Sequence, residues 1–323
     1  EIWLLAVETA MCSTLSTLLF KCYADMKKTK REKWIKDWPG QMTLTSGQLA
    51  WTVECTKALH AIADGQKAAM RQAKKKQVNL LNKLCDMVRS PLDKLSRSKV
   101  VNIVSIEVHG RDVLDRMAKA GCASVNDFEW LLQLRFYFEQ GTERCVVRQT
   151  NTTSLYGYEY LGNVGRLVIT PLTDRCYTTL TTALHLHRGG LPQGPAGTGK
   201  TETVKDLAKS LAKQCIVFNC SDGLDYKSLG RMFSGLAQTG AWSCFDEFNR
   251  IEVEVLSVVA QQILSILTAI TQGKERFVFE GRDIKLDRTC GIFVTMNPGY
   301  AGRSELPENL KALLRPISMM TPD

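Results

Sequence analysis

The sequence predicts an α/β protein in two parts, a mainly helical first half followed by a parallel sheet with helices on both faces. In the first part, apolar residues recur at spacings of three and four, as in residues 80–88, with few glycines or prolines. From about residue 166 onward, short apolar runs alternate with stretches of helical composition. The 323 residues are enough for roughly two domains, each with its own core. We therefore predict one domain over residues 1–165 and a second over 166–323.

The composition excludes several classes of protein. A hydrophobic share of 44% with 23% charged residues excludes a disordered chain. Apolar stretches such as Leu15–Phe20 are interrupted by Ser and Thr, so we expect no membrane span. The chain begins at Glu1 without a secretion-signal pattern and reads as a fragment of a longer protein. Its 11 cysteines have neither disulfide-framework nor zinc-site spacing, which favours reduced thiols and a cytoplasmic location.

The net charge of +9 is concentrated in the first half, where 24 Lys and Arg stand against 17 Asp and Glu. The densest basic runs are residues 27–33 and 71–76, both of helical composition. A nucleic-acid or microtubule contact is one interpretation of such runs, and a solvated helix face is the other. We favour the solvated face.

Three local signals organise the first half. The run Asp37–Gly40 contains Pro and Gly and should end a helix. Thr45 or Ser46 is a plausible N-cap for a helix over Gln48–Arg71. The β-branched and aromatic residues of Cys145–Gln149 and Leu155–Tyr160 predict a short hairpin.

The second half contains five short runs that we read as strands of a parallel sheet. A parallel sheet binds ligands at the carboxyl ends of its strands. The runs are Leu167–Ile169, Gly189–Gln193 (which contains Pro192 and must be short), Ile216–Phe218, Trp242–Phe245 and Ile292–Met296.

A phosphate-binding loop follows the second of these runs. The motif Gly-x-x-x-x-Gly-Lys-Thr is matched in full, and a helical run, Glu202–Lys213, comes directly after it, as the mechanism requires. Backbone amides of such a loop hold phosphate oxygens, the lysine reaches the β and γ phosphates, and the threonine ligates Mg²⁺. The alternative is a chance glycine-rich turn. The motif residues are Gly194, Pro195, Ala196, Gly197, Thr198, Gly199, Lys200 and Thr201.

Three further polar residues follow later strands. Asp246 and Glu247 end the Trp242–Phe245 run, and we predict that Asp246 holds magnesium through water while Glu247 is the general base for the attacking water. Asn297 follows the Ile292–Met296 run and should touch the γ phosphate or position water. The alternatives are a helix cap for the acidic pair and a turn-forming role for the asparagine.

Arg315 follows an apolar helix end. The residue either completes the phosphate site of a neighbouring module or is a helix-terminal arginine favoured by the dipole. The sequence leaves these two interpretations open.

Taken in order, these motifs resemble those of an AAA+ ATPase, with Gly194–Thr201 as Walker A, Cys244–Glu247 as Walker B and Asn297 as the sensor-1 residue. Longer segments resemble the first AAA+ module of dynein heavy chains and the second half of the dynein linker. The sequence around the phosphate loop is more similar to axonemal than to cytoplasmic chains. The segments that carry this resemblance are 38–41, 51–52, 147–149, 156–162, 169–177, 194–203, 220–226, 244–250 and 296–307.

The resemblance implies a role for each half of the chain. Residues 1–165 would be the C-terminal part of the linker, and 166–323 the large subdomain of the first AAA+ module, a P-loop αβα domain. The implied nucleotide contacts include Glu202, which continues the phosphate loop, and an adenine pocket lined by Leu167, Val168 and Pro171. Arg315 matches the arginine-finger position that serves an adjacent module. The hairpin 276–286 matches an insert that contacts the linker.

The implied function is that of an ATP-hydrolysing motor fragment, in which Mg-ATP (or ADP) at the site drives linker movement toward the microtubule minus end and ciliary or flagellar beating. The expected partners are microtubules, through a stalk outside this chain, other AAA+ modules of the same heavy chain, and dynein intermediate and light chains, without nucleic acid or membrane. The expected location is the cytoplasm and cytoskeleton, in the axoneme. Because the chain stops at Asp323, before the small lid, we expect the fragment alone to be inactive.

Two other classes remain. A module that binds nucleotide without turnover is one, although the intact Asp246–Glu247 pair argues against it. A DNA-handling AAA+ protein is the other, but the basic runs lack the interleaved aromatic residues of strand-binding surfaces.

Overall fold

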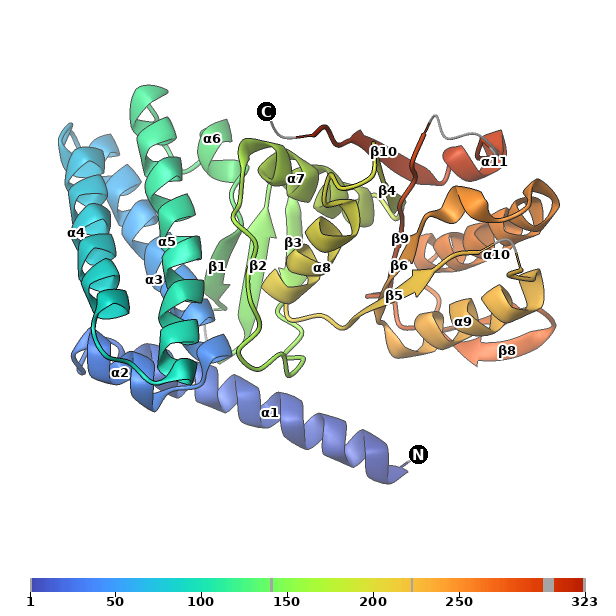
Figure 1. The fold of residues 1–323 in the computed structure, drawn as a ribbon, viewed down its shortest axis with the longest axis horizontal. Helices are drawn as coiled ribbons and strands as arrows, with labels where there is room; N and C mark the ends of the chain where they lie inside the picture. The colour runs from blue at the N-terminus through green and yellow to red at the C-terminus, as the bar shows by residue number, and fades with distance from the viewer. Residues whose placement is uncertain (1, 140–141, 222, 299–304, 322–323) are drawn as a thin grey trace. The chain divides into compact units, whose positions relative to one another are not determined.

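The computed structural model describes residues 2–139, 142–221, 223–298 and 305–321, and Figure 1 shows the course of the chain. The chain divides into two compact units, Glu1–Asp174 and Arg175–Asp323. This division falls nine residues after the expected boundary between 165 and 166. The assignment of the two parts as linker and AAA+ module stays a prediction.

The first unit is built mainly from helices, as the 3.6-residue periodicity predicts. Pro39 is the N-cap residue of the third helix, so the Pro–Gly pair separates two helices as expected. The helices are α1 (Ile2–Asp25), α2 (Arg31–Asp37), α3 (Gly40–Ala63), α4 (Ala69–Arg89), α5 (Lys94–Lys119) and α6 (Phe128–Leu131).

The predicted N-cap at Thr45 or Ser46 is wrong, since α3 begins at Gly40. Thr45 lies inside the helix, where its hydroxyl donates to the Gln41 carbonyl at 3.0 Å. The predicted continuation to Arg71 is also wrong, because the chain turns at Asp64 and Gly65, whose φ of 95° suits glycine. Two helices therefore replace the single one expected.

The hairpin is one part of a three-stranded antiparallel sheet, in the order β1 (Arg135–Phe138), β2 (Cys145–Gln149) and β3 (Thr152–Leu155). The first strand of the predicted hairpin is confirmed. The second strand comes earlier than expected, because Thr150 adopts a left-handed φ of 49° and makes the turn tight. The Tyr156 side chain beyond it is buried and pairs its hydroxyl with Thr45 at 3.0 Å.

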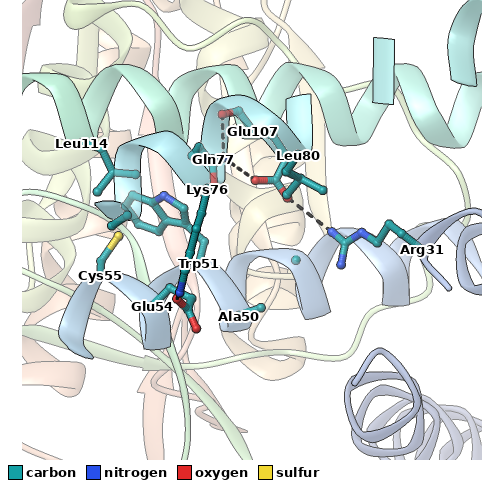
Figure 2. A pocket seen from close by; sticks show the side chains of 12 residues that line it. Arg31, Ala50, Trp51, Glu54, Cys55, Lys76, Gln77, Leu80, Glu107 and Leu114 are labelled. Carbon is teal, nitrogen blue, oxygen red and sulfur yellow. Dashed lines mark hydrogen bonds and ion pairs between the residues drawn. The ribbon is translucent and has the colours of Figure 1, made fainter. Parts of the chain in front are cut away.

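A buried polar cluster joins three helices of the first unit (Figure 2). Arg31 of α2 forms an ion pair with Glu107 of α5 at 3.4 Å, and Gln77 of α4 donates to the same carboxylate at 2.6 Å. Trp51 and Cys55 of α3 help to line the adjoining cavity of about 220 Å³. Burial raises the pKa of Glu107 and lowers that of Arg31, so desolvation outweighs their mutual attraction.

The second unit is a five-stranded parallel sheet in the order β10-β4-β9-β6-β5, which confirms the predicted α/β fold. Its strands are β4 (Gly189–Gln193), β5 (Cys215–Asn219), β6 (Trp242–Asp246), β9 (Gly291–Val294) and β10 (Leu314–Ser318). The other elements are α7 (Pro171–His185, which begins in the first unit), α8 (Lys200–Ser210), α9 (Tyr226–Thr239), η1 (Phe248–Arg250), α10 (Val253–Thr271), the hairpin β7 (Arg276–Phe279) and β8 (Arg282–Lys285), and α11 (Glu308–Lys311).

Both faces of this sheet are covered, as the near-continuous apolar strands predict. Phe245 of β6 packs on Phe233 of α9, with ring centroids 5.1 Å apart. Trp242 lies three residues earlier in β6, so its side chain is on the opposite face, where it packs on Phe293 of β9 at 5.0 Å. All four aromatic side chains are buried.

Three expectations for the second half are wrong in detail. Leu167–Ile169 forms no strand, and Val168 is 69% exposed. Arg315 was expected after a helix end, but it lies in β10, the edge strand that pairs with β4. There it is opposite Gly190. The helix after the phosphate loop is α8, which starts two residues earlier than predicted and ends at Ser210.

Within the described part of the chain, two helices, α1 and α10, are long and apolar enough to cross a membrane by length and composition alone, whereas we expected the apolar stretches to be too short. In the most apolar 18-residue stretch of α10, half of the residues are buried in the core of the second unit, as in core helices of soluble proteins. In the corresponding stretch of α1, 11% are buried. The expected absence of a membrane partner stays a prediction.

The ion pair between half-buried Arg31 and buried Glu107 predicts an asymmetric mutational response. We expect Arg31→Met to destabilise the first unit by about 3 kcal/mol, because Glu107 loses its counter-charge. The double variant Arg31→Met/Glu107→Met should return to within about 1 kcal/mol of the wild type. Hydrogen exchange of the α5 amides measures both effects. Lys76→Met, which removes the exposed 3.2 Å pair with Glu54, is the control. Equal losses of stability in the single and double variants would contradict the idea that the cost comes from an unpaired Glu107.

Candidate functional site

The phosphate-loop sequence connects β4 to α8. Gly194 begins the loop with a φ of 156°, and a Cβ there would lie 2.0 Å from the Met319 carbonyl oxygen, so only glycine fits. Gly199 is the N-cap residue of α8, in a left-handed conformation with a φ of 77°. The loop therefore ends at a helix N-terminus, where free backbone N–H groups and the helix dipole favour an anion.

Lys200 is the first residue of α8 and is 7% exposed. Its ammonium group donates to the carbonyl oxygens of Gly194 and Pro195 at 2.9 and 2.6 Å. The cationic group thus lies within the loop, among backbone acceptors that a phosphate oxygen would replace.

The hydroxyl of Thr201 donates to Oδ1 of Asp246 at 2.6 Å, although the two residues are 45 positions apart. This contact joins the start of α8 to the carboxyl end of β6. A hydroxyl and a carboxylate oxygen at this separation are hard oxygen ligands of the kind that Mg²⁺ takes in nucleotide sites.

Glu247 lies beyond the strand end in a left-handed conformation with a φ of 54°. Asn297 donates its side-chain N–H to one carboxylate oxygen at 3.0 Å, and Arg250 forms an ion pair with the other. Asn297 is 4% exposed. The carboxylate is therefore oriented from two sides.

These groups surround one cavity of about 190 Å³. It is lined by the phosphate loop, the start of α8 and the residues that follow β6 and β9. The lining residues are Ala196, Gly197, Gly199, Lys200, Thr201, Glu202, Asp246, Glu247 and Asn297. The predicted phosphate, carboxylate and asparagine positions thus converge.

Other predicted positions do not line this cavity, among them Gly194, Pro195 and Thr198 of the loop itself. Leu167, Val168 and Pro171 belong to the first unit, where Leu167 is half-buried and the other two are exposed. Arg315 is exposed on β10. The segment 299–304, which contributes to the family resemblance, lies outside the described residues, as does Asp222.

Two residues that contact the site were not anticipated. Arg250 lies three residues after Glu247, a spacing that brings its guanidinium to the carboxylate. Thr295 lies two residues before Asn297, and its hydroxyl contacts both Asp246 and Glu247. The sequence signal for Thr295 is a hydroxyl in an otherwise apolar strand run.

A thiol nucleophile is not part of this arrangement. Burial raises the pKa of Cys220 to about 12, and the nearby Asp246 and Glu247 carboxylates add to the shift. The thiol therefore stays protonated at neutral pH and is inert. The chemistry that the geometry favours is phosphate binding and attack by water.

A phosphate loop before a helix N-terminus, with carboxylates at the end of a parallel strand nearby, defines the class of the second unit: it is a P-loop domain of the AAA+ αβα type. Residues 156–323 match the family model described as the hydrolytic ATP binding site of dynein motor region. The chain belongs to this dynein family.

Similar curated proteins are axonemal dynein heavy chains. The chain is 61% identical to mouse (Mus musculus) dynein axonemal heavy chain 2 over 327 residues. It is 60% identical to the human (Homo sapiens) protein of that name over 326 residues, and 60% identical to the dynein-1-beta heavy chain of the flagellar inner arm I1 complex of Chlamydomonas reinhardtii over 323. All of this chain is covered in each comparison, but it spans only 7% of the length of these relatives.

The position of Lys200 predicts its effect on nucleotide binding. We expect Lys200→Met to weaken ATP binding by roughly 10- to 100-fold, because a charge-assisted hydrogen bond to phosphate is lost. Titration with a fluorescent ATP analogue measures the affinity. Lys227→Met, which removes an exposed lysine of α9, is the matched control; unchanged affinity in Lys200→Met would show that nucleotide binds elsewhere.

Proposed function

We propose that this chain is the ATP-hydrolysing site of a dynein heavy chain, together with the adjoining part of its linker. The observation that supports this most directly is the pair of contacts Thr201–Asp246 and Asn297–Glu247 around one cavity. A cation ligand pair and an oriented carboxylate are what hydrolysis of a phosphoanhydride needs. Family membership supports the same reaction.

In the proposed mechanism, Lys200 binds the β and γ phosphates, and the loop amides hold the remaining oxygens. Thr201 and Asp246 would hold Mg²⁺, which neutralises phosphate charge when bound. Glu247 accepts the proton of the attacking water, while Asn297 keeps its carboxylate aimed at that water. Glu202 and the glycines complete the lining of the site.

The further assignments rest on the resemblance to the family. We propose residues 1–165 as the C-terminal part of the linker and 166–323 as the large subdomain of the first AAA+ module. Leu167, Val168 and Pro171 are proposed adenine contacts, and Arg315 is proposed to serve an adjacent module. Contacts between protein and γ phosphate exist only before hydrolysis, so the two nucleotide states bias the linker differently.

The names of the relatives support the cellular setting. We propose that the parent heavy chain works in a ciliary or flagellar axoneme, binds microtubules through a stalk outside this chain, and assembles with intermediate and light chains. The 60% identity to a heavy chain of the flagellar inner arm I1 complex supports this axonemal setting.

One observation favours a second function. Arg250 and Asn297 engage both oxygens of Glu247, which leaves fewer of the carboxylate's lone-pair positions for the proton of the attacking water. A module that binds ATP for regulation without turnover would not need those positions. Mutation of Glu247 separates the two functions.

In the full-length heavy chain, we expect Glu247→Gln to keep ATP binding and to reduce microtubule-stimulated turnover by at least about 100-fold, because the general base is lost. Turnover with and without microtubules, together with nucleotide affinity, measures the two effects. Glu254→Gln, in the first turn of α10, is the control. Equal turnover in wild type and Glu247→Gln would establish the regulatory function.

The 323-residue chain alone should bind ATP without microtubule-stimulated turnover, since the stalk and neighbouring modules are supplied by other parts of the heavy chain. A steady-state phosphate-release assay with purified microtubules tests this expectation. Cooperative, microtubule-stimulated release by the isolated chain would contradict it.

A further inference from the structure

Thr295 lies directly after β9, opposite Asp246 at the end of β6. Its backbone N–H continues the strand pairing by donating to the Phe245 carbonyl at 2.9 Å, and its carbonyl accepts from Phe248 at 3.0 Å. The residue is 0% exposed. Its side chain therefore has a fixed place between the two strands of the site.

The hydroxyl of Thr295 makes two contacts, with consecutive residues of the site. It donates to Oδ1 of Asp246 and accepts the backbone N–H of Glu247 at 3.1 Å. A hydroxyl has one donor and two acceptor positions, so both bonds are satisfied together.

The two contacts have different effects: one orients the carboxylate of Asp246, and the other restrains the backbone of Glu247. Asp246 Oδ1 also accepts from Thr201, so the two threonine hydroxyls fix the carboxylate from α8 and from β9. Glu247 has a left-handed φ of 54°, a conformation that is unfavourable for a residue with a side chain unless the surroundings hold it. The hydrogen bond to its N–H supplies part of that restraint.

We propose that Thr295 is a positioning residue for ATP hydrolysis, which orients the Asp246 carboxylate and fixes the backbone of Glu247 so that its carboxylate meets the attacking water. The inference rests on the proposed function of this site. Thr295 itself touches neither nucleotide nor water in this role. Its removal should therefore affect the chemical step more than nucleotide binding.

The test compares Thr295→Val with Thr295→Ser in the full-length heavy chain. Valine has nearly the same shape but no hydroxyl, whereas serine keeps the hydroxyl and loses one methyl group. We expect Thr295→Val to lower kcat for ATP roughly 10- to 100-fold with KM changed less than about threefold. Thr295→Ser should restore kcat to within about threefold of the wild type.

Two controls separate this proposal from a general loss of folding and from failure of the proposed function. Thr181→Val removes another buried hydroxyl of the second unit, one that bonds to the Tyr177 carbonyl of its own helix at 3.0 Å, and should leave kcat unchanged. Fluorescent ATP affinity reports whether each variant keeps a formed nucleotide site. Glu247→Gln reports whether this site hydrolyses ATP at all.

Each outcome has a definite meaning. Loss of turnover in Thr295→Val with ATP binding kept and rescue by serine supports the proposal. Wild-type turnover in Thr295→Val while Glu247→Gln is inactive overturns it and leaves the proposed function intact. Equal loss of binding and turnover in both Thr295 variants overturns it in favour of a purely structural role. Normal turnover in Glu247→Gln overturns the proposed function itself.

Discussion

One carboxylate oxygen, Oδ1 of Asp246, holds the candidate site together. It accepts hydroxyl groups from Thr201 at the start of α8 and from Thr295 after β9. The phosphate loop, the acidic strand end and the asparagine strand end are thus fixed to one another through a single atom. Because each hydrogen bond to a charged acceptor is stronger than a neutral one, the junction resists rearrangement when the surrounding loops move.

The two units differ in whether their ionisable groups pair with each other or lie beside a cavity. In the first unit, Arg31 and Glu107 form a pair whose desolvation outweighs their attraction, as the shifts of both pKa values indicate. Such a pair is expected to add little to stability when both partners are present. In the second unit, the ionisable groups of the site lie at strand ends beside a cavity, where a bound ligand can contact them.

The sequence predicted the parts of the fold that depend on local pattern. The apolar runs at β5, β6 and β9 and the phosphate-loop motif were identified because each is continuous in sequence. The edge strand β10 was not, since Arg315 and Pro316 interrupt its apolar pattern and the pairing with β4 joins residues distant in sequence. Leu167–Ile169 has a strand-like composition, but strand formation also needs a partner strand, which composition does not reveal. Thr295 was missed for a similar reason, because its role follows from the register between β9 and β6.

The close approach of Gly194 to Met319 has a consequence for how the protein is made. The N–H of Met319 also donates to the Gln193 carbonyl at 2.7 Å, so the start of the phosphate loop rests on the chain that follows β10. That segment leaves the ribosome after the rest of the sheet. The start of the phosphate loop is therefore completed only after β10 has been made, and the newly made sheet exposes one edge of β4 until then.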